Sequence, residues 1–99
     1  MNIIILSGVG EMTNQEIAVE IVMLAHNRNR EYVDPDMVTV EILDEGQKIT
    51  YNMGEGITIV IEYYPLYDWI MATCLTSEGG HVWGIYAVSK VVELFRKLK

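Results

Sequence analysis

The sequence is poor in cysteine, proline and basic residues. Its 99 residues include one cysteine, two prolines and seven lysines and arginines, against 14 aspartates and glutamates. Cys74 has no second cysteine with which to form an internal disulfide, and no repeated Cys/His spacing typical of a zinc site occurs. These absences exclude a disulfide-stapled scaffold and a zinc finger, and they favour a reducing, cytoplasmic location.

Long uninterrupted apolar runs are also missing. The apolar segment at residues 3–6 ends at Ser7 and has no positive charge before it, so it is too short and wrongly flanked for a signal peptide. The most apolar stretch, residues 57–75, is interrupted by Glu62 and Asp68, whose charges would be costly inside a bilayer. We therefore expect no signal peptide and no membrane span.

Half of the sequence is nevertheless hydrophobic. Hydrophobic residues make up 51% of the chain and charged residues 21%, which at this length is typical of one folded domain with a single core. No repeat, low-complexity tract or linker divides the sequence, so residues 1–99 are interpreted as one domain. Twelve isoleucines and few leucines are consistent with an A/T-rich genome, such as that of a virus or a mobile element.

The spacing of apolar residues predicts the order β-α-β-β-β-β-α. Residues 3–6 form a short β-branched run, and a capping box at Thr13 and Glu16 begins a helix that extends to about Arg30. A second helix is expected from Ala87, with apolar residues along one face. Between the helices, alternating apolar and polar residues predict four strands, at residues 38–43, 48–53, 57–64 and 66–76.

This order predicts an α+β fold. We expect a mixed, mostly antiparallel sheet of four or five strands with both helices on one face. The strand at residues 3–6 would join the sheet through a right-handed β-α-β crossover. Residues 81–86 fit either a short strand or the lead into the last helix.

The turn between the first strand and the first helix is a candidate anion site. Ser7, Gly8, Gly10 and Thr13 occupy the place where phosphate-binding loops hold an anion against helix amides. The turn lacks the Gly-Lys-Ser/Thr of a Walker loop and the third glycine of a dinucleotide fingerprint, and Glu11 would repel an anion. The sequence therefore favours a plain β-α turn, with anion or small-ligand binding as an alternative.

No set of residues points to catalysis or to a cofactor. His26 and His81 lack the spacing of a metal site, and the acidic residues lack the spacing of a calcium loop or a two-carboxylate hydrolase. Cys74 and His81 would form a nucleophile pair only if the fold brought them together. Because Cys74 alternates with apolar residues, a buried structural cysteine is favoured. We expect no catalytic residue, metal or cofactor, and favour a non-enzymatic protein.

The acidic residues are concentrated in the middle of the chain. Residues 31–80 contain ten acids and one base, Lys48, a net charge of −9, whereas residues 81–99 contain one acid and four bases. Such a field repels nucleic acid and anionic membranes, and it attracts basic partners. The predicted partner-binding face consists of Asp34, Asp36, Glu41, Asp44, Glu45, Glu55 and Glu62.

Hydrophobic residues exceed what one face of the predicted sheet can bury. Aromatic residues and methionine left on the other face are typical of an interface. The predicted homodimer interface consists of Val60, Tyr64, Tyr67, Trp69 and Met71. An alternative is a register error at Pro65, which would exchange the two faces of the last predicted strand.

Together these features favour a small acidic interaction module, homodimeric, whose acidic strands bind a basic protein surface. One specific form is a viral or mobile-element inhibitor that occupies a nucleic-acid-binding site by presenting carboxylates where phosphates would lie. Two alternatives stay open: an anion-binding or small-ligand-binding protein, and a nucleic-acid-associated dimer. The second alternative would use the basic C-terminal residues Lys90, Arg96, Lys97 and Lys99, although the overall negative charge disfavours it.

Overall fold

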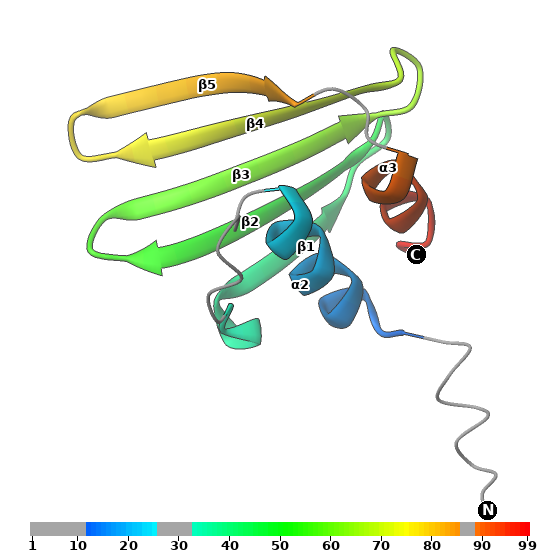
Figure 1. Ribbon diagram of the computed structural model, residues 1–99, viewed down its shortest axis with the longest axis horizontal. Helices are drawn as coiled ribbons and strands as arrows, with labels where there is room; N and C mark the ends of the chain where they lie inside the picture. Colours follow the sequence, from blue (N-terminus) through cyan, green and yellow to red (C-terminus); the bar gives the residue numbers. More distant parts are fainter. Residues whose placement is uncertain (1–11, 26–32, 86–88) are drawn as a thin grey trace, which may run out of the picture.

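An antiparallel sheet of five strands packs against two helices (Figure 1). The computed structural model describes residues 12–25, 33–85 and 89–99, without the side chains of residues 83–85. The strands follow one another in the sheet in sequence order, and every neighbouring pair is antiparallel. The predicted α+β class is therefore confirmed. The strands are β1 Val38–Ile42, β2 Gln47–Gly54, β3 Ile57–Tyr64, β4 Trp69–Thr76 and β5 Gly79–Ile85.

The described elements include one strand more than the four predicted between the helices. Within the described residues the order is α-β-β-β-β-β-α, because residues 79–85 form a strand. A side-chain turn closes the β4–β5 hairpin: Thr76 Oγ1 accepts a hydrogen bond from the Glu78 amide at 3.2 Å and donates one to the Gly79 carbonyl oxygen at 3.1 Å. The strand predicted at residues 3–6, together with its crossover, lies outside the described residues.

The fourth strand begins later than predicted. Residues 65–68 form a turn in which the Tyr67 amide donates to the Tyr64 carbonyl oxygen at 3.0 Å and the Asp68 amide donates to that of Pro65 at 3.1 Å. Asp68 has a positive φ of 51°, which a strand does not allow. The prediction that the strand begins at residue 66 is therefore wrong by three residues.

The first helix begins at the predicted capping box. The Thr13 amide donates to Glu16 Oε1 at 2.9 Å, and the Glu16 amide donates to Thr13 Oγ1 at 3.1 Å. Helix α2 covers Asn14–Ala25 and helix α3 covers Ser89–Arg96; the predicted extensions to residues 30 and 87 fall outside the described residues. Neither helix has the length and apolar character to cross a membrane.

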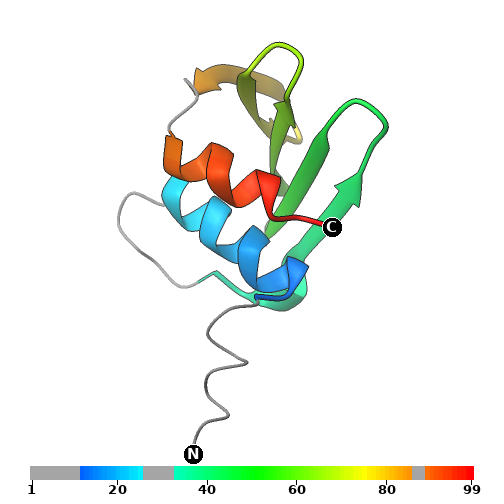
Figure 2. The ribbon, with the colours of Figure 1, turned by 90° about the vertical axis from the view of Figure 1, so that its right-hand side faces the viewer.

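Both helices lie on the same side of the sheet and side by side (Figure 2). Asn14 holds them together, since its Nδ2 donates to the Lys99 carbonyl oxygen at 2.9 Å and its Oδ1 accepts from the Lys99 amide at 3.1 Å. Alternate residues of the strands face the helices, as predicted. The buried core contains Ile17, Ala18, Ile21, Val22, Val38, Ile49, Ile59, Ile61, Tyr63, Ile70, Ala72, Val91, Val92, Leu94, Phe95 and Leu98.

Candidate interaction surface

The face of the sheet opposite the helices, here called the outer face, contains four of the five predicted interface residues. Ile70 and Ala72 of β4 are buried in the core, so the alternating Trp69 and Met71 lie on the outer face. The predicted register of β4 is thus confirmed, and the alternative of exchanged faces is wrong. Tyr64 pairs with Trp69 across β3 and β4.

The predicted interface residues differ widely in exposure. Val60 is only 8% exposed, whereas Trp69 is 49% and Tyr67 is 71% exposed. Tyr64 and Met71 are half-buried. Val60 therefore has little area to offer a partner, and the accessible aromatic area is concentrated at the end of the sheet that carries the β3–β4 turn.

Other exposed apolar side chains lie at the same end of the sheet as Tyr67 and Trp69. Leu43 directly follows β1, and Leu66, which is 84% exposed, lies in the β3–β4 turn. In an antiparallel meander alternate turns emerge at the same end of the sheet, so the β1–β2 and β3–β4 turns are neighbours. Exposed apolar clusters of this kind mark binding surfaces.

A charged row leads across the outer face to these aromatic residues. The register of β1, β2 and β3 places Glu41, Lys48 and Glu62 side by side on adjacent strands. Lys48 Nζ lies 4.0 Å from Glu41 Oε1. The Tyr64 hydroxyl donates a hydrogen bond of 2.5 Å to Glu62 Oε2. Glu62 therefore joins the charged row to the aromatic end of the sheet.

Glu45, in the β1–β2 turn, also acts on Tyr64. The pKa of Tyr64 is raised to about 12, first by its hydrogen bond to Glu62, then by partial burial, and then by the negative charges of Glu62 and Glu45. An effect of this kind requires the carboxylate to be nearby. The β1–β2 turn thus adds its negative charge to the same end of the sheet.

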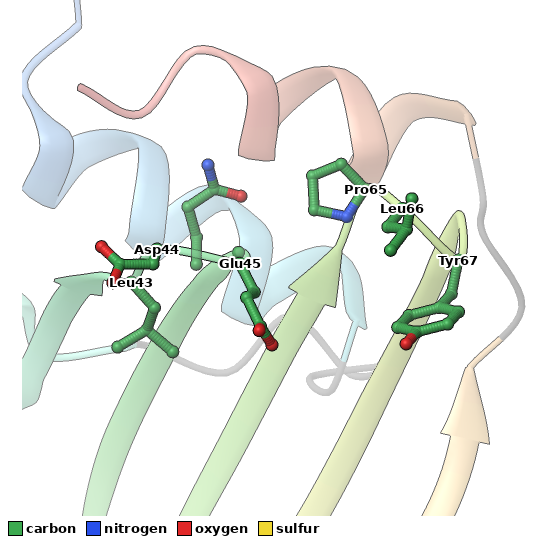
Figure 3. A pocket seen from close by; sticks show the side chains of 8 residues that line it. Leu43, Asp44, Glu45, Pro65, Leu66 and Tyr67 are labelled. Atoms are coloured by element: carbon green, nitrogen blue, oxygen red, sulfur yellow. The ribbon is translucent and has the colours of Figure 1, made fainter.

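A groove of about 410 Å³ lies between the two turns (Figure 3). Glu45 and Tyr67 project in the same direction from the two turns. The groove combines carboxylates with apolar walls, and none of its lining residues is basic. It is lined by Leu43, Asp44, Glu45, Gly46, Gln47, Pro65, Leu66 and Tyr67.

Gly46 allows the β1–β2 turn to pack closely onto β3. A Cβ atom at this position would lie 2.1 Å from the Tyr63 carbonyl oxygen, which is far inside contact distance. The turn is closed by a hydrogen bond of 2.8 Å from the Leu43 amide to the Gly46 carbonyl oxygen. Glycine is therefore needed at position 46, where the β1–β2 turn contacts the end of β3.

The seven acidic residues predicted as one face fall into two groups. Glu41, Asp44, Glu45 and Glu62 lie at the end of the sheet with the two turns, and Asp68, which was not predicted, joins them there. We call these five residues, together with Leu43, Tyr64, Leu66, Tyr67 and Trp69, the acidic-aromatic surface.

The other three predicted acids lie toward the opposite end of the sheet. Asp34 and Asp36 precede β1, and Glu55 lies in the β2–β3 turn. Asp34 accepts a hydrogen bond of 3.0 Å from the Asp36 amide and so caps the 3-10 helix Pro35–Met37. These acids therefore do not contribute to the acidic-aromatic surface.

The residues predicted for the two alternative functions, anion binding and nucleic-acid association, do not belong to the acidic-aromatic surface. Ser7, Gly8 and Gly10 lie outside the described residues, and the Thr13 amide already donates to Glu16 in the capping box. The basic residues Lys90, Arg96, Lys97 and Lys99 are exposed on and after α3. They belong to the helical layer, on the other side of the molecule from the outer face.

The structure does bring together the cysteine and histidine that the sequence separates. Cys74 of β4 is the register partner of His81 of β5, and alternation places both on the face that the helices cover. Cys74 is half-buried and His81 is exposed. Among the described residues, no group of three or more His, Cys, Asp or Glu side chains could hold a metal ion.

Comparison with known protein families, curated proteins and solved structures found no match. No activity and no site residue of this chain can therefore be inferred from a relative. The candidate site is therefore the acidic-aromatic surface and the groove within it.

Proposed function

We propose that this chain is a non-enzymatic interaction module that binds a basic protein partner through the acidic-aromatic surface. The observation that carries the proposal is the combination, at one end of the sheet, of five carboxylates and exposed aromatic and aliphatic side chains. Lys48 is the only base that the register places among them. Aromatic anchors supply contact area, and charge of one sign supplies partner selection and fast association.

A specific form of this function is inhibition of a nucleic-acid-binding protein. Such a protein presents a basic surface to phosphates, and a set of carboxylates on a rigid sheet can occupy that surface instead. The row of Glu41 on β1 and Glu62 on β3, with Lys48 of β2 between them, supports this form, because the paired strands fix the carboxylates relative to one another. In this form the chain and the nucleic acid would compete for the same partner.

A charge-reversal experiment tests the proposed function. The double variant Asp44→Lys/Glu45→Lys reverses two charges within the acidic-aromatic surface, and Glu55→Lys/Glu78→Lys makes the same change in net charge at the opposite end of the sheet. Binding is measured on an array of immobilised peptides that vary in basic and apolar content. We expect the first variant to lose the peptides that the wild type and the second variant retain, and all binding to weaken as salt rises. Equal losses by both variants would show that only net charge matters.

A second candidate function is self-association through the outer face. The observation that favours it is that, within the described residues, the helices cover one side of the sheet and leave Trp69 and Met71 on the other. A second copy would bring its own Glu41 and Glu62 to this face, so repulsion between like charges opposes such a dimer. The homodimer and the basic partner are therefore expected to respond to salt in opposite directions.

A further inference from the structure

The groove between the β1–β2 and β3–β4 turns has a more specific chemistry than negative charge alone. We propose that it binds an arginine side chain presented by the basic partner. This inference rests on the proposed function and names the residue of the partner that enters the acidic-aromatic surface.

The negative charge of the groove is not compensated from within. Asp44 and Glu45 are exposed, and no lysine or arginine of the described residues lines the groove. The nearest base along the chain, Lys48, lies on β2 opposite Glu41, with 4.0 Å between its Nζ and Glu41 Oε1. A cation from outside would therefore meet carboxylates that have no cationic partner among the lining residues, and Glu45 is the one that projects to the same side as Tyr67 (Figure 3).

The apolar walls favour arginine over lysine. Tyr67 is 71% exposed and projects in the same direction as Glu45, with Pro65 and Leu66 beside it (Figure 3). A guanidinium is planar and weakly hydrated, so it can stack on an aromatic ring while its N–H donors, in the plane, reach carboxylates. An ammonium group is a strongly hydrated point charge, which gains less from such walls.

Gln47 also lines the groove, but it alternates with the buried Ile49 and pairs with the buried Tyr63, so its side chain lies on the helix-covered side of β2. Its Oε1 is buried and accepts no hydrogen bond from the described residues. The volume of about 410 Å³ lies within the range of small-ligand pockets, so the groove has room for a side chain and the backbone next to it.

The test uses three short peptides of the sequence Gly-Leu-Xaa-Leu-Gly, with arginine, lysine or the neutral isostere citrulline at the centre. Binding to the full chain is followed by the shifts of backbone amide resonances. We expect saturable shifts at residues 43–47 and 66–67 with the arginine peptide. The lysine peptide should bind about two- to fivefold more weakly, as the contribution of an exposed cation–aromatic contact implies. The citrulline peptide should not bind measurably.

Variants separate the role of the ring from the role of the charge. Tyr67→Leu keeps an apolar wall but removes the ring, so it should abolish the preference for arginine over lysine. Asp44→Asn/Glu45→Gln should weaken both cationic peptides, and the matched control Glu55→Gln/Glu78→Gln should change neither. Because all these positions are exposed, the variants are expected to fold.

Three outcomes would overturn the inference. Equal affinity for the arginine and lysine peptides, or shifts confined to other parts of the chain, would show that the groove does not select arginine. Concentration-dependent shifts at the groove without peptide would show that a second copy of the chain occupies it. If arginine selection is absent while charge reversal still abolishes binding to the peptide array, only the inference fails; if no basic peptide binds anywhere, the proposed function fails as well.

Discussion

Glu62 is the residue at which the two predicted surfaces meet. Alternation along the strand predicted that Glu62 and Tyr64 lie on the same side of the sheet. It did not show that they interact, so Glu62 was assigned to the acidic face and Tyr64 to the apolar interface. In the structure the Tyr64 hydroxyl donates to Glu62 Oε2, and Lys48 lies opposite Glu62 on β2. The two predicted surfaces are therefore contiguous at Glu62.

The Tyr64 hydroxyl gives this contact a measurable signature. Its pKa is raised to about 12 from the ordinary value of 10.0, chiefly by the hydrogen bond to Glu62. The folded state thus holds the phenolic proton more tightly than the unfolded state does. This contribution to the free energy of unfolding is complete below about pH 10 and is lost as the pH rises toward 12.

We expect Glu62→Gln to lower the pKa of Tyr64 toward its ordinary value, because it removes the negative charge of the acceptor. Tyr64→Phe should remove the highest tyrosine ionisation step from an absorbance titration. The matched control Tyr67→Phe, in the adjacent turn, should leave that step in place. A highest step that survives in Tyr64→Phe would show that another tyrosine is responsible for it.

Among the elements, the strands were predicted best where turn residues mark both ends. The bounds of β3 agree with the prediction at both ends, because a glycine turn precedes Ile57 and Pro65 follows Tyr64. β5 was ambiguous because its seven residues include three glycines, which carry no periodic signal. The predicted start of β4 is too early because Leu66 and Tyr67 are apolar turn residues, and a pattern based on hydropathy alone does not distinguish them from strand residues.

The capping box of α2 was also predicted, since it depends only on residues three positions apart. We expect Thr13→Ala to reduce the free energy of unfolding by about 1 kcal/mol, because the Glu16 amide loses its acceptor. Thr13→Ser keeps the oxygen and serves as the control in denaturant titrations. A loss in Thr13→Ser as large as that in Thr13→Ala would show that the methyl group, and not the cap, stabilises the helix.

Acidification should weaken the same cap. The pKa of Glu16 is lowered, first by the hydrogen bond from the Thr13 amide and then by the one with the Thr13 side chain. Because the folded state favours the ionised form, this contribution to stability is present above the ordinary pKa of the carboxyl and is lost as the pH falls through its lowered value. Thr13→Ala should therefore lose less stability than the wild type on acidification, as measured by thermal unfolding at stepped pH.

For the whole molecule, the meander decides which residues share a surface. Local patterns identified the turns at residues 44–46 and at Pro65, but they did not show that these turns are neighbours or that a groove lies between them. That groove requires a contact between residues distant in the chain, since Gly46 meets the backbone of Tyr63. The same topology separates Asp34, Asp36 and Glu55 from the other acids, so net charge along the sequence overestimated the size of the acidic face.

The charges of the molecule also predict how its oligomeric state depends on salt. Two copies that meet through their outer faces would bring the Glu41 and Glu62 residues of both chains together, so screening should strengthen a homodimer at the outer face. A complex with a basic partner should instead weaken. Mass measurements by light scattering at about 50 mM and about 500 mM salt distinguish these cases, because the Debye length falls severalfold between them.

In this experiment Trp69→Ser should abolish a dimer of the outer face, whereas the control Leu24→Ser, at an exposed leucine of α2, should not. A monomer at both salt concentrations would contradict the predicted homodimer and leave the acidic-aromatic surface free for a basic partner. A dimer that is more stable at low salt would require contact between surfaces of opposite charge. The basic residues Lys90 and Arg96 of α3, and Lys97 directly after it, would then be its expected contacts, and reversing their charges should dissociate the dimer.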